Sequence, residues 1–314
     1  MGQIAVVGCG LVGRAWAISF ARAGHQVRLW DQLDGAAEAA VGRIGALLPD
    51  LRANGLLRGA DPAEVMARIE VAATMQQALA GAAHVQENTP EDLATKQAVF
   101  RALDEAADPE TVLASSTSGL LPSKFSEGLP GKGRCLVAHP INPPYLIPAA
   151  EVVPAPWTRP EVVDRTAALL RDAGHAPIVM NRETDGFVIN RLQGALLDEA
   201  FRLVADGFAS PEDVDVAIRD GLALRWSFMG PFETIDLNAP GGVRDYVARY
   251  GPLYWSLKAA EKPIDWTGPV LDRIEADRRA ALPLDQLGER SAWRDRRLMA
   301  LAAHKQKAKA DIGE

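Results

Sequence analysis

Short apolar runs alternate with longer segments of helical spacing over the first part of the chain. The runs lie at residues 3–7, 26–30, 69–73, 84–86, 111–114, 136–138, 152–153 and 177–180. Between most of them, apolar residues recur at the spacing of one face of an α-helix. Strands that alternate with helices form βαβ units, which build parallel sheets. The pattern therefore predicts an α/β fold with a mostly parallel sheet.

The pattern changes after Asp185-Gly186, beyond which the periodicity is helical throughout. The first predicted helix has an apolar stripe formed by Ile189, Leu192, Leu196, Leu197, Phe201 and Val204. Its other side carries Gly186, Asn190 and Gly194, which leave room for a ligand beside Asn190 or simply face solvent. We therefore expect two domains, an α/β domain over residues 1–184 and an all-α domain over residues 185–314.

Residues 34–69 form an alanine-rich helical segment that is longer than one crossover between strands requires. Breaks are expected at Pro49, at Asn54-Gly55 and at Asp61-Pro62. The segment therefore predicts a helical hairpin inserted into the second βα unit. Its role is left open.

Composition narrows the class of protein. The chain has 314 residues, 48% of them hydrophobic, and a formal net charge of -7. That charge argues against nucleic acid or an anionic membrane as a partner, because both attract basic proteins. No tract approaches the ~18 apolar residues of a membrane-spanning helix. Cys9 and Cys135 have no metal-ligand spacing and cannot form a disulfide framework, so we expect a cytoplasmic protein without a metal.

A glycine-rich motif, Gly8-Cys9-Gly10-Leu11-Val12-Gly13, joins the first predicted strand to a helix. In this context the first glycine permits a tight turn, the second lets a pyrophosphate approach the backbone, and the third lets helix and strand pack closely. The phosphates would lie at the helix N-terminus. The predicted cofactor-binding residues of this loop are Gly8, Gly10, Leu11, Val12 and Gly13, and the predicted N-terminal domain is of the Rossmann type.

The second predicted strand ends in Asp31, at the distance from the glycines where dinucleotide-binding domains place an acidic residue. A carboxylate there accepts hydrogen bonds from both ribose hydroxyls and repels a 2′-phosphate. No arginine follows Asp31. The sequence therefore predicts NAD, in preference to NADP, as the cofactor.

A rigid segment with candidate chemistry begins at His139. The residue follows the apolar run 136–138, and ligands of open α/β sheets bind at the carboxyl ends of strands. Four prolines between 140 and 148 exclude helix and sheet interior. Glu151, at the edge of the next apolar run, is placed to return to the histidine. A histidine held by a glutamate has a fixed tautomer and can act as a general base, whereas a purely structural histidine is the alternative.

Other polar residues at strand ends have two interpretations each. The hydroxyls of Ser115-Ser116-Thr117-Ser118 are turn residues, or groups directed into the cleft. Thr89 is predicted to cap a helix that starts at Pro90 and runs to about residue 107, with Asp92 completing the capping pair. On that helix, Lys96 is expected to be a surface charge or a cofactor contact.

Taken together, these motifs resemble the 3-hydroxyacyl-CoA dehydrogenase superfamily over nearly the whole chain. The shared pattern comprises the glycine motif, Asp31, Ser116-Thr117-Ser118, His139, Asn142-Pro143, Glu151 and Gly186-Phe187-Val188-Ile189-Asn190-Arg191. The segments 86–93, 139–148, 225–234 and 293–295 are similar to those of the branch that contains L-gulonate 3-dehydrogenase and lambda-crystallin.

The resemblance implies a role for each matching position. His139 is the implied general base with Glu151 as its partner, and Ser118 and Asn190 bind the substrate oxygen. Asp31 binds the adenosine ribose. The resemblance also assigns cofactor-binding positions to Glu87 and Lys96.

Two departures from the acyl-CoA members argue against a CoA thioester as substrate. Those members carry two aromatic residues after the histidine, where this chain has Pro140-Ile141. They also have a short turn in place of the longer segment 225–231. The implied activity is NAD-dependent oxidation of the 3-hydroxyl of a small 3-hydroxy carboxylic acid. The alternatives are a dehydrogenase for 3-hydroxyacyl-CoA or carnitine, and a non-catalytic crystallin-like or NAD-sensing protein.

Two expectations concern the helical domain. Arg225 lies among apolar residues, where a buried guanidinium requires an anion, either the substrate carboxylate or an internal Asp or Glu. Trp255, Trp266 and Trp293 suggest more apolar surface than a small core can cover. Relatives also dimerise through this region, so we expect a homodimer.

Overall fold

The computed structural model describes residues 2–259 and 263–313. By its internal contacts the chain divides into two compact units. The first comprises residues 1–189 together with 295–304, and the second comprises residues 190–294 together with 305–314. Each unit is described by itself.

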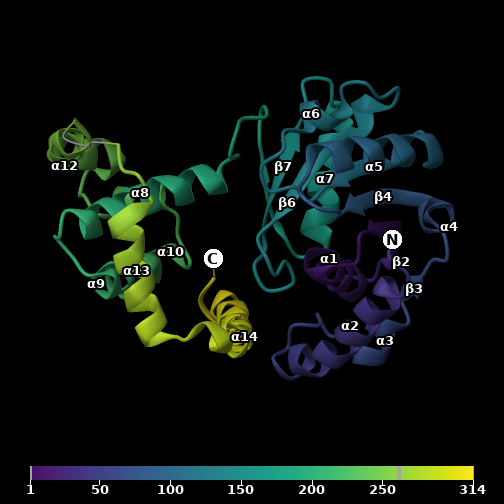
Figure 1. The fold of residues 1–314 in the computed structure, drawn as a ribbon, viewed down its shortest axis with the longest axis horizontal. Coiled ribbons are helices and arrows are strands. Elements are labelled where there is room, and N and C mark those ends of the chain that lie inside the picture. The colour runs from purple at the N-terminus through teal and green to yellow at the C-terminus, as the bar shows by residue number, and fades with distance from the viewer. Residues whose placement is uncertain (1, 260–262, 314) are drawn as a thin grey trace. The chain divides into compact units, whose positions relative to one another are not determined.

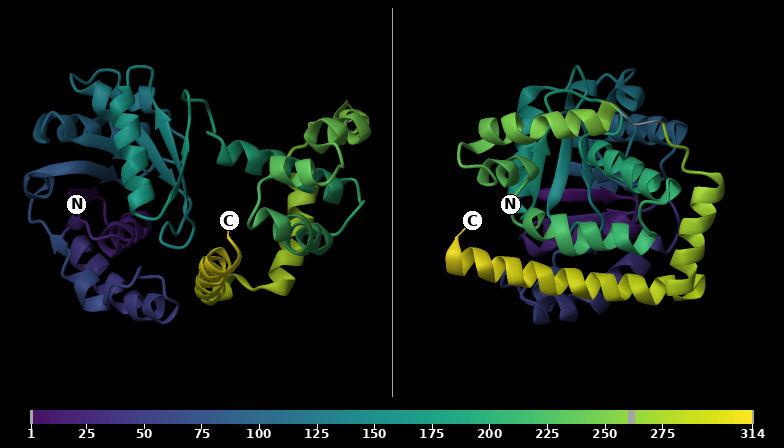
Figure 2. Two further views of the ribbon diagram at one scale, coloured as in Figure 1. Left: turned by 180° about the vertical axis from the view of Figure 1, so that it is seen from behind. Right: turned by 90° about the vertical axis from the view of Figure 1, so that its left-hand side faces the viewer.

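An eight-stranded sheet forms the centre of the first unit, with the strand order β3-β2-β1-β4-β5-β6-β7-β8 (Figures 1 and 2). The strands are β1 Gln3–Val7, β2 Gln26–Trp30, β3 Ile69–Val71, β4 Ala82–Glu87, β5 Val112–Ser115, β6 Cys135–Pro140, β7 Ala149–Pro154 and β8 Ala176–Val179. Neighbouring strands are parallel except for the antiparallel pair β6 and β7. The strand order reverses between β1 and β4, and ligands of such sheets bind beyond the carboxyl ends of the strands at this point.

Two hydrophobic cores lie on opposite faces of the sheet, because successive side chains of a strand point to opposite sides. In β1, Ile4 and Val6 belong to one core, whereas Ala5 and Val7 belong to the other. The first core is covered by α1 Leu11–Arg22, α2 Ala36–Ala53, α3 Pro62–Met66 and α7 Pro160–Asp172. The second is covered by α4 Met75–Leu79, α5 Leu93–Ala106 and α6 Pro122–Ser126. The α/β prediction is confirmed.

The helical insertion is present, but Pro49 lies inside α2 and does not break it. A proline within a helix costs ~3 kcal/mol, since one backbone hydrogen bond is lost. Leu48 and Leu51, on either side of it, are completely buried, and each such burial is worth ~1.5–3 kcal/mol. The free energy gained by burying these leucines therefore offsets the cost of Pro49, and the helix continues through it. After the turn, α3 begins with a capping box. In it the Asp61 side chain accepts a hydrogen bond from the Glu64 backbone N–H, and the Glu64 side chain accepts one from the Asp61 backbone N–H.

The predicted start of the helix after β4 is wrong by three residues. Helix α5 starts at Leu93, and its cap is Asp92, whose carboxylate accepts a hydrogen bond from the Thr95 backbone N–H at 2.8 Å. Thr89 does not act as the cap because its hydroxyl donates to Glu87. The expectation that Lys96 is a surface charge is also wrong, since its side chain is 1% exposed.

The described residues of the second unit form helices and the turns that connect them (Figure 1). Its elements are α8 Ile189–Ala205, α9 Pro211–Val216, a π-helical turn Ala217–Leu222, α10 Ala223–Trp226, α11 Pro231–Leu237, α12 Gly242–Ala259, α13 Gly268–Ala281 and the two ends of α14 Leu287–Ile312, whose residues 295–304 belong to the first unit. The described part of the chain contains no helix that is long and apolar enough to span a membrane.

Candidate active site

The glycine loop between β1 and α1 has the geometry that its motif predicts. Gly8 has φ +87°, and a Cβ there would lie 2.8 Å from the backbone of Asn88. A Cβ on Gly13 would lie 1.9 Å from the Gly8 carbonyl oxygen, so both positions exclude larger residues. A Cβ on Gly10 would meet nothing within 4 Å. The space beside Gly10 is therefore open to a ligand that approaches the backbone and the start of α1.

Asp31 is held against this loop by two backbone amides. Its Oδ2 accepts a hydrogen bond from the Cys9 N–H at 2.7 Å, and its Oδ1 accepts one from the Leu33 N–H at 2.9 Å. Each carboxylate oxygen has a second lone pair. Asp31 is thus fixed beside the glycine loop and still able to accept hydroxyl donors.

His139 and Glu151 are directly opposite each other on the antiparallel strands β6 and β7. Their side chains lie on the same face of the sheet, and His139 Nδ1 is 2.8 Å from Glu151 Oε2. Glu151 Oε1 accepts hydrogen bonds from the backbone N–H groups of Val188 at 2.7 Å and Ile189 at 3.0 Å. Glu151 is completely buried and His139 is 7% exposed. The register of one β-ladder therefore brings together the pair that the sequence proposed.

The charge state of Glu151 follows from these contacts. Burial by itself raises the pKa of the carboxyl, but the hydrogen bonds from His139 and from the Ile189 and Val188 amides outweigh it and lower the pKa. An ionised Glu151 selects the His139 tautomer that carries its proton on Nδ1. The Nε2 lone pair is then available to accept a proton.

Phe187 was not identified from the sequence as a functional residue. It has φ +50°, an uncommon backbone conformation for a bulky side chain, within the turn that precedes the Val188 and Ile189 amides. Its buried ring packs 5.7 Å from the His139 ring, measured between centroids. Strain of this kind persists where the surroundings hold it, and here it directs two amides at Glu151. The preceding Asp185-Gly186 was the only sequence signal for the turn.

Glu87 and Lys96 form a buried ion pair beside the loop that follows β4. Lys96 Nζ lies 2.8 Å and 2.9 Å from the two Glu87 oxygens and donates to the Thr89 carbonyl at 2.9 Å. Ser115 Oγ donates to the same carboxylate at 2.6 Å. These bonds join the ends of β4 and β5 to α5. The proposed cofactor contact of Glu87 and Lys96 stays a prediction, and the pair's observed bonds are to the protein.

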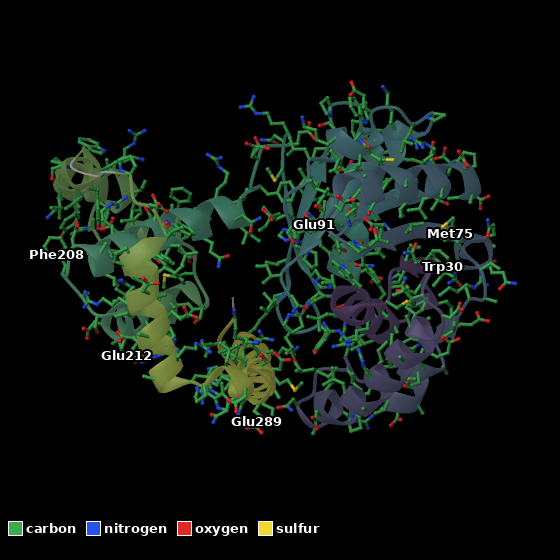
Figure 3. The ribbon with its side chains drawn as sticks, viewed as in Figure 1. Trp30, Met75, Glu91, Phe208, Glu212 and Glu289 are labelled. Carbon is green, nitrogen blue, oxygen red and sulfur yellow. The ribbon has the colours of Figure 1, made fainter. Side chains whose placement is uncertain are left out.

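Glu91 is the second residue that the sequence did not single out. It lies on the loop after β4 (Figure 3) and accepts hydrogen bonds from the backbone N–H groups of Ser118 at 3.0 Å and Gly119 at 3.1 Å, and from the Thr117 hydroxyl. Ser118 itself is exposed. An acidic residue on a loop at the carboxyl edge of the sheet was the available signal. Glu91 holds the turn that presents Ser118.

The family follows from the match of both parts of the chain. Residues 3–184 match the NAD-binding domain of 3-hydroxyacyl-CoA dehydrogenase, and residues 186–266 match its C-terminal domain. The chain belongs to the 3-hydroxyacyl-CoA dehydrogenase family. It is accordingly an NAD-dependent oxidoreductase that acts on CH–OH groups.

Relatives within this family match over almost the full length. The lambda-crystallin homolog of Bos taurus is 43% identical over 305 residues, which cover 96% of this chain and 95% of the relative. The L-carnitine dehydrogenase of Pseudomonas putida is 35% identical over 318 residues, with coverage of 98% and 95%.

Solved structures of other dehydrogenases share the architecture. The 5-formyl-3-hydroxy-2-methylpyridine 4-carboxylic acid 5-dehydrogenase, an NAD+-dependent dismutase, superposes with a TM-score of 0.81 at 28% identity, covering 96% of this chain and 97% of that one. The 3-hydroxybutyryl-CoA dehydrogenase of Escherichia coli gives a TM-score of 0.66 at 30% identity, covering 81% of this chain and 53% of that one.

The remaining predicted site residues of this dehydrogenase lie in the second unit. Asn190 is the second residue of α8. Arg225 is on α10, where it donates to Asn238 Oδ1 at 3.5 Å and is exposed, as are Leu224, Trp226 and Phe228. The expectation that apolar burial forces an anion onto Arg225 is therefore wrong. No carboxylate of the described residues lies within 4.0 Å of its guanidinium, so the site prediction rests on the resemblance.

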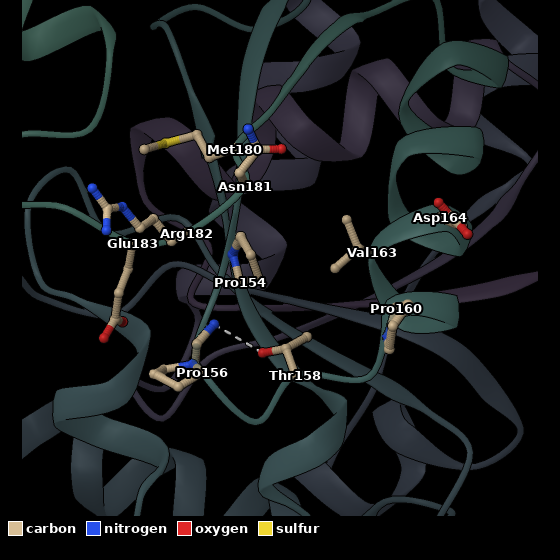
Figure 4. Close-up of a pocket in the computed structure, with 11 residues that line it drawn as sticks. Pro154, Pro156, Thr158, Pro160, Val163, Asp164, Met180, Asn181, Arg182 and Glu183 are labelled. Carbon is tan, nitrogen blue, oxygen red and sulfur yellow. Dashed lines mark hydrogen bonds between the residues drawn. The ribbon is translucent and has the colours of Figure 1, made fainter.

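The first unit has a groove of about 390 Å³ (Figure 4). It is lined by Pro154, Thr158, Val163, Met180 and Arg182 among others, and includes none of the predicted site residues. Among residues 2–259 and 263–313, no group of three or more His, Cys, Asp or Glu side chains is arranged to hold a metal ion.

Proposed function

We propose that this dehydrogenase oxidises the 3-hydroxyl of a small 3-hydroxy carboxylic acid, with L-gulonate as the first candidate. The observation that carries the proposal is the 2.8 Å contact between His139 Nδ1 and Glu151 Oε2, because it leaves Nε2 as a base. The absence of paired aromatics after His139 and the 43% identity to a lambda-crystallin homolog support a free acid over a CoA thioester.

The proposed mechanism divides the reaction between a proton and a hydride. His139 Nε2 accepts the proton of the substrate hydroxyl, while Ser118 and Asn190 hold the oxygen. The positive imidazolium that results is stabilised by the ionised Glu151, whose lowered pKa keeps it charged. Bound NAD supplies the acceptor for the hydride from C3. The products are a 3-keto acid, NADH and one proton.

The residues around the glycine loop of the first unit are suited to bind NAD. The steric limits at Gly8 and Gly13 and the open space at Gly10 suit a dinucleotide, and Asp31 has lone pairs for the ribose. Asn142 Oδ1, three residues after His139, is buried and lacks a hydrogen-bond partner among the described residues. Leaving such an acceptor unsatisfied costs ~1–3 kcal/mol, so Asn142 is a residue that would hold the bound cofactor.

The alternatives differ in substrate or in class. The 35% identity to an L-carnitine dehydrogenase keeps carnitine, itself a 3-hydroxy acid, as the second candidate. A crystallin-like or NAD-sensing protein would not need a hydrogen bond between the side chains of His139 and Glu151, which lie opposite each other on β6 and β7.

The test is the initial rate of NAD reduction with L-gulonate, carnitine, 3-hydroxybutyrate and 3-hydroxybutyryl-CoA, each with the wild type and with His139→Gln. We expect kcat/KM for L-gulonate to exceed that for the CoA thioester by about tenfold or more, which corresponds to ~1.4 kcal/mol. The highest value for the thioester would contradict the free-acid proposal. No turnover with any of the four substrates would favour the non-catalytic class.

We further propose that the protein works as a homodimer in the cytoplasm. Large apolar side chains of the second unit are exposed in the single chain, including Leu192 at 64%, Phe232 at 80% and Trp255 at 64%. The predicted stripe of α8 is thus only partly covered, although Val204 is buried. Apolar surface of this extent is typical of an interface with another chain.

A further inference from the structure

A network of buried and partly buried polar side chains passes through the first unit, and Ser116 is at its centre. The Ser116 hydroxyl oxygen accepts hydrogen bonds from Trp16 Nε1 at 3.0 Å and Gln86 Nε2 at 2.7 Å, and donates to Asn88 Oδ1 at 2.7 Å. A hydroxyl has one donor and two acceptor positions. All three are therefore used, so Ser116 Oγ has no capacity for a further conventional bond.

The direction of each bond in the network is set by groups that have only one role. The indole N–H of Trp16 can only donate, and the Ala138 carbonyl, which receives Gln86 Nε2 at 3.1 Å, can only accept. Gln86 must therefore present its nitrogen to Ser116, and Ser116 must donate to Asn88. The Gln86 oxygen then accepts from His84 Nε2 at 3.0 Å. Trp16 and Gln86 are completely buried, whereas Ser116 and Asn88 are partly buried.

The network joins three segments of the first unit that carry predicted site residues. Trp16 is on α1, directly after the glycine loop, and Asn88 limits the space at Gly8. Ser116 lies two residues before Ser118. Ala138 directly precedes His139 in β6. A single hydroxyl thus links the cofactor loop, the Ser118 turn and the strand of the general base.

We propose that Ser116 is a positioning residue, which fixes the cofactor loop, the Ser118 turn and His139 relative to one another through Trp16, Gln86 and Asn88. Its effect on turnover rests on the proposed function. Its effect on cofactor binding rests only on the family's use of NAD. Losing the hydroxyl leaves two donors and one acceptor without their partner, and small displacements in an active site cost large factors in rate.

The first unit offers a matched control for this proposal. Ser126 is completely buried, whereas Ser116 is partly buried, and the Ser126 hydroxyl accepts from Trp157 Nε1 at 3.2 Å and donates to the Pro122 carbonyl at 2.6 Å. Ser126→Ala therefore removes the same kind of serine–tryptophan contact from a place that carries no site residue. Comparison of Ser116→Ala with Ser126→Ala separates positioning from stability.

The experiment measures thermal unfolding, NADH affinity by calorimetry, and kcat and KM for the full-length chain. We expect both alanine variants to melt at lower temperature. Only Ser116→Ala should weaken NADH binding, by about 3- to 10-fold, and lower kcat, by about tenfold or more. Ser116→Thr, which keeps the hydroxyl, should recover most of the loss. Equal NADH affinity and equal kcat in Ser116→Ala and Ser126→Ala would overturn the proposal.

Two further arms keep the test decisive. If Ser116→Ala does not fold, Trp16→Phe removes one donor and keeps the aromatic ring, and it should weaken NADH binding by about threefold. Unchanged binding in that variant would overturn the proposal. If the wild type oxidises none of the 3-hydroxy acids, the proposed function fails, whereas the NADH affinities still decide the role of Ser116.

Discussion

His139 and Glu151 occupy opposite positions of one antiparallel ladder, so their hydrogen bond is fixed by strand register and not by a flexible loop. Replacing His139 with Gln removes the proposed base and leaves the ladder intact. We expect kcat to fall by a factor on the order of 10²–10⁴, with NAD affinity retained. Glu151→Gln should cause part of this loss, and the double variant should lose less than the product of the two factors. Steady-state kinetics measure these losses in kcat. Near-normal turnover in His139→Gln would show that the histidine has only a structural role.

Cofactor preference is predicted to depend on Asp31. Its carboxylate is held by the Cys9 and Leu33 amides beside the glycine loop. Asp31→Ala removes the ribose acceptor and the repulsion of a 2′-phosphate together. The ratio of kcat/KM for NAD to that for NADP should fall by about tenfold or more. Each factor of ten corresponds to a free-energy difference of ~1.4 kcal/mol. A ratio equal to that of the wild type would exclude this role.

Stability is predicted to fall between neutral and mildly acidic pH because of two buried histidines. Burial lowers the pKa of His84 and of His175 from 6.5 to about 4. Between these values the unfolded chain binds protons that the folded chain does not. Each histidine therefore reduces the free energy of unfolding by ~1.4 kcal/mol per pH unit as the pH falls from about 6.5 towards 4.

Denaturant unfolding of the wild type and of His175→Gln at several pH values measures this effect. The variant should show a shallower pH dependence over the same window, by about the slope of one histidine. Parallel curves for the two proteins would mean that His175 titrates normally in the folded state.

Arg225 is predicted to bind the substrate carboxylate. Since the side chain is exposed and its hydrogen bond to Asn238 is long, at 3.5 Å, Arg225→Ala should leave the melting temperature almost unchanged. A charged hydrogen bond is worth ~1.5–3 kcal/mol, so KM for a 3-hydroxy acid should rise by about 10- to 150-fold. Arg225→Lys should also raise KM, because an ammonium does not reproduce the planar fork. An unchanged KM with either variant removes Arg225 from the site.

Dimerisation is predicted to bury the apolar surface of the second unit. Light scattering at micromolar concentration should give twice the chain mass of 33.7 kDa. Leu192→Glu should weaken the assembly, because it places a charge within the exposed stripe of α8. A monomer in the wild type would contradict the proposal, and a dimer unaffected by Leu192→Glu would locate the interface elsewhere.

Local patterns of the sequence predicted much of the fold and part of the candidate site. The glycine motif requires only a strand, a turn and a helix that are adjacent in the chain, and all three are present. The pairing of His139 with Glu151 needed only two neighbouring strands, so a short span of sequence contained the information. The alternation of strands and helices predicted the sheet, and the change of periodicity predicted the helical second part.

Features that depend on distant partners were not predictable in the same way. Lys96 is buried because its ammonium pairs with the Glu87 carboxylate and donates a hydrogen bond to the Thr89 carbonyl. The helical pattern around Lys96 does not reveal these partners. The local sequence also predicted Thr89 as a helix cap, but in the structure the Thr89 hydroxyl donates a hydrogen bond to Glu87. Pro49 stays within a helix because of the leucines packed around it. Glu91 accepts hydrogen bonds from backbone amides of another segment, and Phe187 precedes the two amides that donate to the distant Glu151, so the local pattern does not predict either contact.

The turn at Phe187 links the acidity of Glu151 to the start of a helix. The two amides that lower the pKa of Glu151 belong to Val188 and Ile189, and α8 begins at Ile189 and continues with Asn190. Unwinding of this first helical turn would release both amides and make the carboxyl less acidic. The carboxylate partner of His139 would then be easier to protonate, and Asn190 would change position at the same time. The pH profile of the reaction is therefore a reporter of local order at the N-terminus of α8, measurable without any probe attached to the protein.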